Sequence, residues 1–275
     1  MKLIILISTI DDGIKKIKNI LKNPREDVIY IISHQHQNKK YKDIPKELIR
    51  KDIIISQIPG KGISKNRNNA ISKVSDGICL IADDDISFIS NSFDKIIEIF
   101  EKNHDLDVAC FKIKTKNGEP EYKKYPKKSA LIKSRLKRGY YISSIEIAFK
   151  TSSIKKNKIY FDENFGIGSD LMIGGEEKIF IKECVKKNLK VMFFPYYISK
   201  HSYFSTMKKL SKFNNKRIFL DGGVDAEIIG YLSIIKAFIK TIYFTPTLLR
   251  KFKNPLKYLN TRLHGIFYIL KKNKE

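Results

Sequence analysis

Cysteine is scarce in this chain of 275 residues, and its three copies form no recognisable cluster. Cys79, Cys110 and Cys184 lie in apolar surroundings, show no CxxC spacing and have no histidine at zinc-ligand spacing. The pattern excludes a disulfide-stapled fold and a zinc finger. It predicts reduced, buried thiols in a cytoplasmic protein.

Long hydrophobic runs are also missing. The stretch MKLIILIST at the amino terminus holds a short apolar run before Ser8 and Asp11. That run is too short for the core of a signal peptide and is typical of a buried strand. Two apolar segments near the carboxyl terminus are not clean spans of about 20 apolar residues. The sequence contains no internal repeat.

Acidic residues are outnumbered, with 29 Asp and Glu against 54 Lys and Arg, which gives a net charge of +25. A strongly basic chain can bind nucleic acid, an anionic membrane or a polyphosphate ligand. Because the lysines are dispersed along the whole length, a surface simply coated in lysine explains the charge equally well. We find no clustered aromatic and basic residues for stacking on bases, which argues against a nucleic-acid-binding protein.

Apolar runs alternate with segments of helical spacing over the first hundred residues. Because these runs are apolar throughout, they predict an α/β fold whose mostly parallel sheet is covered by helices on both faces. Ligands of such sheets bind beyond the carboxyl ends of the strands. Strands are expected at 3–8, 28–33, 52–56, 78–82, 107–112, 143–150 and 191–195, and helices at 13–21, 63–74, 92–101 and 176–187.

Three consecutive aspartates, Asp83, Asp84 and Asp85, follow the expected strand at 78–82. Three carboxylates in one small volume are costly unless a cation is present. Hard oxygen ligands suit Mg²⁺ or Mn²⁺, which often bind through one or two carboxylates and the phosphates of a ligand. The alternative is an acidic cap on the helix that follows. The sequence favours a site for a divalent cation and a diphosphate.

A glycine-rich stretch, GKGISKNRNNAIS (60–72), precedes the aspartates by one helix and one strand. Lys65 and Arg67 fall in the first turn of the expected helix, where free N–H groups and the helix dipole favour an anion. A surface helix with ordinary basic residues is the alternative. The nearby aspartates favour a diphosphate at this helix start.

A pair of glutamates, Glu176 and Glu177, begins a helix after a glycine-rich loop. The helix dipole alone would favour acidic residues there. Adjacent carboxylates also repel each other and raise a pKa, which suits a general base. His201 follows the last expected strand, and it becomes a metal ligand only if the fold brings it near Asp85.

The order of these motifs resembles glycosyltransferase family 2, whose GT-A-type, Rossmann-like enzymes transfer a sugar from a nucleotide donor. The resemblance covers roughly residues 1–205 and rests on GKGISKNRNNAI, IADDD, FGIGSDLMIGGEEKIFI and the late histidine. It implies a nucleotide-sugar donor, a glycan acceptor and Mn²⁺ or Mg²⁺.

The resemblance also implies roles for individual residues. Asp85 and His201 would hold the metal, Glu177 would be the catalytic base, and Glu176 would contact the acceptor. The strand after residue 28 lacks the acidic end that the family commonly uses for the nucleobase, because Gln35 follows Ser33 and His34 there. The residues expected at the donor are Thr9, Gln35, Lys65, Arg67, Asn68, Asp83 and Asp84.

The carboxyl-terminal segment has a character of its own. Apolar residues repeat at helical spacing over 228–242 and 256–270, with lysines between them. Basic amphipathic helices of this kind lie in membrane interfaces, and the alternative is packing on the catalytic domain or a partner. We therefore divide the chain into a catalytic domain, 1–222, and a basic amphipathic helical segment, 223–275.

These observations predict an inverting, metal-dependent glycosyltransferase. It would act on a lipid-linked glycan in the assembly of a bacterial surface polysaccharide, at the inner face of the plasma membrane. The alternatives are a nucleotidyltransferase on a similar sheet and a basic nucleic-acid-binding protein.

Overall fold

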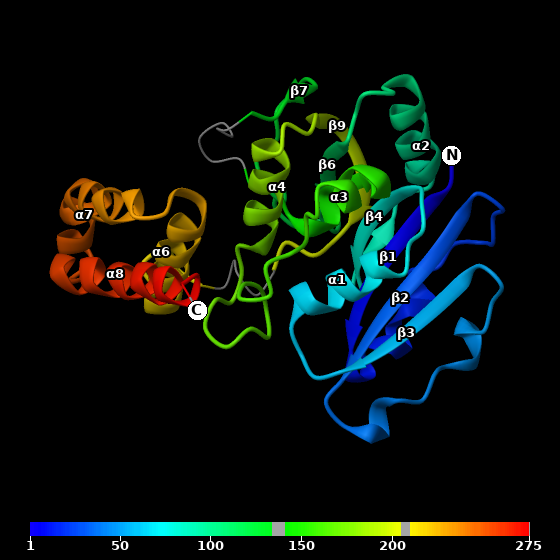
Figure 1. The fold of residues 1–275 in the computed structure, drawn as a ribbon, viewed down its shortest axis with the longest axis horizontal. Coiled ribbons are helices and arrows are strands. Elements are labelled where there is room, and N and C mark those ends of the chain that lie inside the picture. Colours follow the sequence, from blue (N-terminus) through cyan, green and yellow to red (C-terminus); the bar gives the residue numbers. More distant parts are fainter. Residues whose placement is uncertain (134–140, 205–209, 275) are drawn as a thin grey trace.

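The computed structural model describes residues 1–133, 141–204 and 210–274 (Figure 1). The described residues form a nine-stranded sheet with the strand order β3-β2-β1-β4-β8-β6-β9-β5, and β7 pairs with β9. The strands are β1 (Leu3–Ile10), β2 (Val28–His36), β3 (Ile53–Pro59), β4 (Ile78–Asp83), β5 (Ser87–Phe88), β6 (Val108–Lys114), β7 (Ala130–Leu131), β8 (Ile147–Lys150) and β9 (Val191–Lys200).

The helices cover the sheet and extend beyond it. The α-helices are α1 (Ile63–Ser72), α2 (Ser92–Lys102), α3 (Thr151–Lys156), α4 (Glu176–Lys186), α6 (Asn215–Ile229), α7 (Leu232–Arg250) and α8 (Pro255–Lys272). Short 3₁₀ helices are η1 (Asp11–Asn19), η2 (Lys39–Tyr41), η3 (Lys46–Leu48) and η4 (Ser144–Glu146).

The longest strand pairs are parallel, as the apolar runs predict. β1 lies between β2 and β4 and is parallel to both, β3 is parallel to β2, and β6 is parallel to β9. Three short strands are antiparallel to their neighbours: β8 pairs in this way with β4 and β6, and β5 and β7 each pair so with β9. The predicted fold class, a mostly parallel GT-A-type sheet with carboxyl-terminal helices, is confirmed.

Both faces of the sheet are buried under helices. Alternate residues of β1 enter two separate cores, since side chains of a strand point to opposite faces. Leu3, Ile5 and Ile7 pack with η1 and α2, whereas Ile4 and Leu6 pack with α1, α3 and α4. Burial on both sides explains why these strands are apolar throughout.

Several local predictions differ from the structure. The strand expected at 143–150 is confined to β8, because residues 144–146 form the 3₁₀ turn η4. The segment expected as a helix at 13–21 forms the 3₁₀ helix η1, and its buried Ile14, Ile17 and Ile20 recur every three residues, which matches the three-residue turn. The strand expected at 28–33 continues to His36, because β1 and β3 pair with it on both sides. Neither α3 nor α6 was expected.

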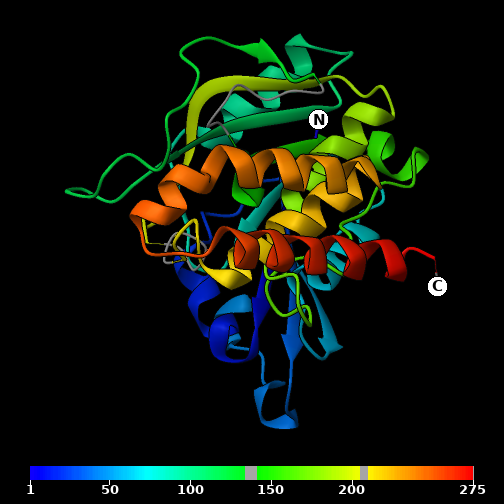
Figure 2. The ribbon, with the colours of Figure 1, turned by 90° about the vertical axis from the view of Figure 1, so that its left-hand side faces the viewer.

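The carboxyl-terminal helices form one closely packed unit at the side of α4 (Figures 1 and 2). α6 and α8 approach so closely that a methyl group at Gly222 would lie 2.2 Å from the backbone oxygen of Arg262, and one at Gly265 would lie 2.0 Å from that of Phe219. The predicted boundary after residue 222 falls inside α6. This unit therefore begins at Asn215.

A buried ion cluster joins the three helices to α4. Asp225 of α6 is 3% exposed and forms an ion pair with the buried Arg262 of α8. Its carboxylate also lies 2.7 Å from the ammonium of Lys236, 3.6 Å from that of Lys240 and 3.9 Å from that of Lys178 in α4. The cluster ties the helical unit to the helix that begins at the glutamate pair.

By length and composition alone, α7 is the one described helix that could cross a membrane. This differs from the sequence expectation, because the helix continues to Arg250, well beyond the predicted end at residue 242. Two of its lysines face Asp225, and α7 packs along α8 (Figure 2).

Candidate active site

An open cleft of about 1620 Å³ runs from the carboxyl ends of β1, β2 and β4, past the first turns of α1 and α4, to α6. This is the edge of the sheet at which parallel strands bind ligands. Residues from distant parts of the chain meet there. The predicted residues that line it are Thr9, Gln35, Arg67, Asp83, Asp84, Asp85, Glu176, Glu177 and His201.

Two predicted donor residues lie elsewhere. The side chain of Lys65 is exposed and does not line the cleft. Asn68 holds the backbone of Phe161, donating to its carbonyl oxygen at 2.8 Å and accepting from its N–H at 2.9 Å. The start of α1 is also less available to an anion than expected, because the N–H of Ile63 donates to the carbonyl oxygen of Ile167.

The three aspartates point in three directions. Asp83 forms an ion pair with Arg67 at 3.1 Å, and Asp84 accepts a 2.5 Å hydrogen bond from the hydroxyl of Thr9. Asp85 lies 3.4 Å from Nε2 of His201. Burial raises the pKa of Asp84, against the opposing hydrogen bond from Thr9. In the described part of the chain, no three His, Cys, Asp or Glu side chains gather as a metal site.

Asp85, just beyond the end of β4, forms an ion pair with His201. Asp85 is 58% exposed to the cleft, whereas His201 is 12% exposed. The hydrogen bond from His201 lowers the pKa of Asp85. Burial opposes protonation of His201, but Asp85 outweighs it and raises the pKa of the imidazole. The geometry meets the condition that the sequence left open, because the fold brings this histidine near Asp85.

The donor set of this pair fits a divalent cation. Nδ1 of His201 lies 2.6 Å from the carbonyl oxygen of Ser202, so Nδ1–H donates there and Nε2 faces Asp85. A backbone partner on the other ring nitrogen is the usual arrangement for a ligating histidine. One carboxylate and one imidazole leave most coordination positions for water and phosphate oxygens, as Mg²⁺ and Mn²⁺ sites require.

Arg67 connects the two acidic motifs. Its guanidinium is 4% exposed and donates to Glu176 at 2.9 Å, to Asp83 at 3.1 Å and to the hydroxyl of Ser144 at 2.7 Å. Its face also lies against the ring of Phe161. These contacts use both terminal nitrogens of the guanidinium, whereas its Nε has no hydrogen-bond partner among the described residues. Arg67 fixes the end of β4 relative to the start of α4.

The two glutamates have different surroundings. Glu176 is buried and paired with Arg67, whereas Glu177 is partly exposed and lines the cleft. Burial of its carboxyl group and the charge of Glu176 raise the pKa of Glu177, against the attraction of Arg67. The turn before them requires glycine, because Gly175 has a φ of +89° and a methyl group there would lie 2.4 Å from Val224.

Two neighbouring residues at the end of β2 have different roles: His34 is structural, whereas Gln35 lines the cleft. His34 is fully buried, with Nε2 at 2.9 Å from the carbonyl oxygen of Asp11 and Nδ1 at 3.2 Å from Nε2 of Gln57. Gln35 is 1% exposed and lines the cleft, and its Nε2 has no hydrogen-bond partner among the described residues. A buried amide without a partner is costly unless a ligand satisfies it.

Comparison with known protein families decides the class of this protein. Residues 8–169, which include Arg67 and all three aspartates, match the model of "Glycosyl transferase family 2". The chain belongs to glycosyltransferase family 2. The predicted resemblance is confirmed, and the protein is a glycosyltransferase rather than a member of the alternative classes.

Solved structures with the same fold include the S. aureus protein TarS. Its residues 1–349 superpose with a TM-score of 0.61 at 18% identity, covering 92% of this chain and 74% of that one. A TarS 1–349 complex with UDP-GlcNAc gives a TM-score of 0.60 at 16% identity, over 97% and 82% of the two chains. The complex with UDP gives 0.58 at 17%, over 89% and 72%. No curated protein matches this glycosyltransferase in sequence.

Several cleft residues of the glycosyltransferase were not predicted. Asn66 donates to the carbonyl oxygen of Thr9 at 2.9 Å, and the ring of Tyr122 meets that of His201 edge-on at 5.8 Å between centroids. Asn66 lies in the singled-out stretch GKGISKNRNNAIS, so its position gave a signal. Tyr122 and Ser144 reach the cleft only through tertiary contacts, so no local pattern in the sequence marks them.

The far end of the cleft is cationic. Lys178, Lys182, Arg217 and Lys236 line it, together with Asp221 and Asp225. Glu177 lines the same cleft from the first turn of α4, the helix that also carries Lys178 and Lys182. The glycosyltransferase therefore has an acidic end and a basic end in one continuous cleft.

Proposed function

We propose that this glycosyltransferase moves a sugar from a nucleoside-diphosphate sugar to a hydroxyl group of a glycan, with inversion at the anomeric carbon. One observation carries the proposal. The same cleft is lined by the Asp85–His201 pair and by Glu177. Donor and acceptor would meet between them.

The donor would lie at the acidic end. A divalent cation bound by Asp85 and His201 would neutralise the diphosphate that leaves. The unpaired amide of Gln35 would contact the nucleobase, in place of the acidic residue common in the family. The TarS structures with UDP and UDP-GlcNAc support a nucleotide-sugar donor in this fold.

Glu177 would act as the general base. Its carboxylate takes the proton of the acceptor hydroxyl as that oxygen attacks the anomeric carbon from the face opposite the diphosphate. The new carbon–oxygen bond forms while the bond to the diphosphate oxygen breaks, so a single displacement inverts the configuration. Arg67 holds Glu176 and Asp83, and thereby positions the base relative to the donor end.

The acceptor would enter from the basic end. Lys178, Lys182 and Arg217 are suited to the phosphates of a lipid-linked glycan, such as an intermediate of surface polysaccharide assembly. The helical unit that supplies this end would hold the enzyme at the inner face of the plasma membrane.

The test uses the slow hydrolysis of nucleotide sugars, measured as release of nucleoside diphosphate. Glu177→Gln should lower the rate by about 10²–10⁴-fold and leave nucleotide binding intact. Glu183→Gln, in the same helix but outside the cleft lining, is the matched control and should behave as the wild type. Near-normal turnover in Glu177→Gln would overturn the base assignment.

A further inference from the structure

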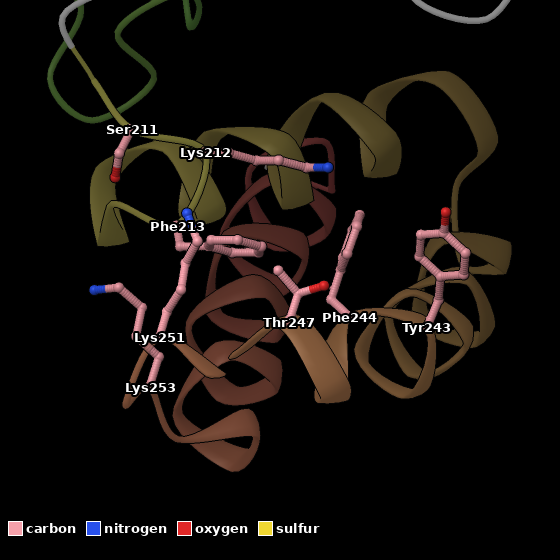
Figure 3. Close-up of a pocket in the computed structure, with 8 residues that line it drawn as sticks. All are labelled: Ser211, Lys212, Phe213, Tyr243, Phe244, Thr247, Lys251 and Lys253. Atoms are coloured by element: carbon pink, nitrogen blue, oxygen red, sulfur yellow. The ribbon is translucent and has the colours of Figure 1, made fainter. Parts of the chain in front are cut away.

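A second cavity lies outside the active cleft, between the segment before α6 and the end of α7 (Figure 3). Its volume is about 620 Å³. The side chains that line it come from residues 211–213, from the last two turns of α7 and from the turn that leads to α8. They are Ser211, Lys212, Phe213, Tyr243, Phe244, Thr247, Lys251 and Lys253.

The charge of this cavity is positive only. Lys212, Lys251 and Lys253 line it, and no acidic side chain from the part of the chain that the structure describes does so. Among the described residues, none of these three ammonium groups has an ion pair, whereas Lys236 and Lys240 of the same region both face Asp225. Unpaired ammonium groups around one cavity form a site for an anion.

Aromatic rings form the rest of the cavity wall. The rings of Phe213 and Phe244 meet edge-to-face at 5.7 Å, and the ammonium of Lys212 lies 4.0 Å from the ring centre of Phe244 (Figure 3). Lys212 also lines the active cleft, so the two cavities share a side chain. The occupant would combine an anionic group with an apolar part.

The turn between α7 and α8 presents an aromatic residue to solvent. Phe252 is 100% exposed, lies between Lys251 and Lys253, and has a φ of +52°. A bulky residue with positive φ is strained, and glycine would fit better. Aromatic residues flanked by lysines suit the boundary between lipid headgroups and acyl chains.

An exposed apolar row on α7 leads into the cavity. Ile239, Tyr243 and Thr247 follow one another at intervals of four residues and so share one side of the helix. The row is continuous with the other exposed apolar residues, each between 48% and 74% exposed, which are Leu232, Ile235, Phe238, Ile239, Ile242, Tyr243 and Leu249.

We propose that this cavity binds the phosphate of an anionic phospholipid headgroup while Phe252 and the apolar row of α7 enter the membrane interface. The site rests on the proposed membrane association, not on the transfer reaction. Because Lys212 borders both cavities, docking in this way would place the basic end of the active cleft at the lipid surface. A lipid-linked acceptor would lie there.

The test is co-sedimentation of the full chain with vesicles of phosphatidylcholine, with and without phosphatidylglycerol. Lys251→Gln/Lys253→Gln should weaken binding to the anionic vesicles roughly thirtyfold, since each lysine near such a surface contributes about 1 kcal/mol. The matched control is Lys39→Gln/Lys51→Gln, two exposed lysines in the segment that connects β2 to β3. These two strands lie across the molecule from the carboxyl-terminal helices (Figure 1). The control variant should change binding less than about twofold, because distant charges are screened.

A second variant separates lipid contact from folding. Phe252→Gly should weaken vesicle binding about tenfold through lost apolar contact, while the melting temperature stays equal or rises because the strained φ is relieved. Glycerol 3-phosphate serves as a soluble probe of the same chemistry in a competition arm.

Four results would overturn the proposal. Equal loss in the two lysine pairs would mean that diffuse charge, not this cavity, attracts the membrane. Unchanged vesicle binding by Phe252→Gly would show that Phe252 does not enter the membrane interface. Absence of wild-type binding to anionic vesicles would contradict the membrane association and the role of the cavity in it. Tight binding of glycerol 3-phosphate without vesicle binding would assign the cavity to a soluble phosphate. Neither of these two results bears on sugar transfer.

Discussion

Replacing Arg67 by methionine should lower the free energy of unfolding by about 3–5 kcal/mol, because removal of one partner leaves buried charges uncompensated. The guanidinium is 4% exposed, and its partner Glu176 is 6% exposed. Methionine has a similar length, so the loss would reflect charge and hydrogen bonds more than a cavity. Asp83 is 33% exposed, so water can solvate its carboxylate once Arg67 is lost, and it contributes less to the destabilisation than Glu176 does.

The assay is denaturant unfolding followed by far-ultraviolet circular dichroism, since the chain contains no tryptophan for fluorescence. Arg217→Met is the matched control. Arg217 is 37% exposed and pairs with Asp221 at 3.4 Å on the surface of α6, so its loss should cost less than about 1 kcal/mol.

A second substitution isolates the interaction between Arg67 and Glu176. In the background of Glu176→Gln, the carboxylate that needs Arg67 is gone, so Arg67→Met should then cost clearly less than in the wild type. Equal losses in both backgrounds, or a loss no larger than that of Arg217→Met, would refute the view that Arg67 ties β4 to α4.

Further predictions concern the base, the turn before it and the thiols. Because the active form of Glu177 is deprotonated and its pKa is raised, kcat/KM should fall as the pH drops below that raised pKa; a flat profile between about pH 5 and 8 would contradict this. For the same reason the ionised group opposes folding at higher pH, so Glu177→Gln should stabilise the protein above the pKa of an unfolded glutamate, as thermal unfolding at alkaline pH would show. Gly175→Ala should lower the melting temperature, because the added methyl group meets α6 at 2.4 Å and φ is +89°, whereas an unchanged melting temperature would show that α6 can move away. Cys79, Cys110 and Cys184 are buried, so the folded protein should react with thiol reagents only after denaturant is added.

The sheet and the acidic strand end could be predicted because both depend on local patterns. Unbroken apolar runs indicate strands buried on both faces, and parallel strands bring their carboxyl ends to one edge. That reasoning placed Asp85 at the ligand edge of the sheet, whereas Thr9 and Glu177 were assigned to the site by the family resemblance. All three line one cleft, although they are far apart in the sequence.

Partner choice within the site was not predictable. A basic residue at a helix start looks alike whether it binds a ligand or a protein carboxylate, and only the fold shows that Arg67 is used by Glu176 and Asp83. The same holds for Asn68, which fastens a backbone segment. The helix α6 was missed because its buried Gly222 and Gly223, which allow α8 to approach, weaken the helical signal.

The central claim is a donor site built on Asp85, and calorimetric nucleotide binding tests it most directly. UDP, GDP, dTDP and CMP would be titrated with and without Mn²⁺ into the wild type, Asp85→Asn and the control Asp76→Asn, which changes an exposed aspartate before the opposite end of β4. The account predicts that one nucleotide binds tightly, that binding requires the metal, and that only Asp85→Asn abolishes it. Metal-independent binding that survives in Asp85→Asn, or no binding of any nucleotide, would contradict the account.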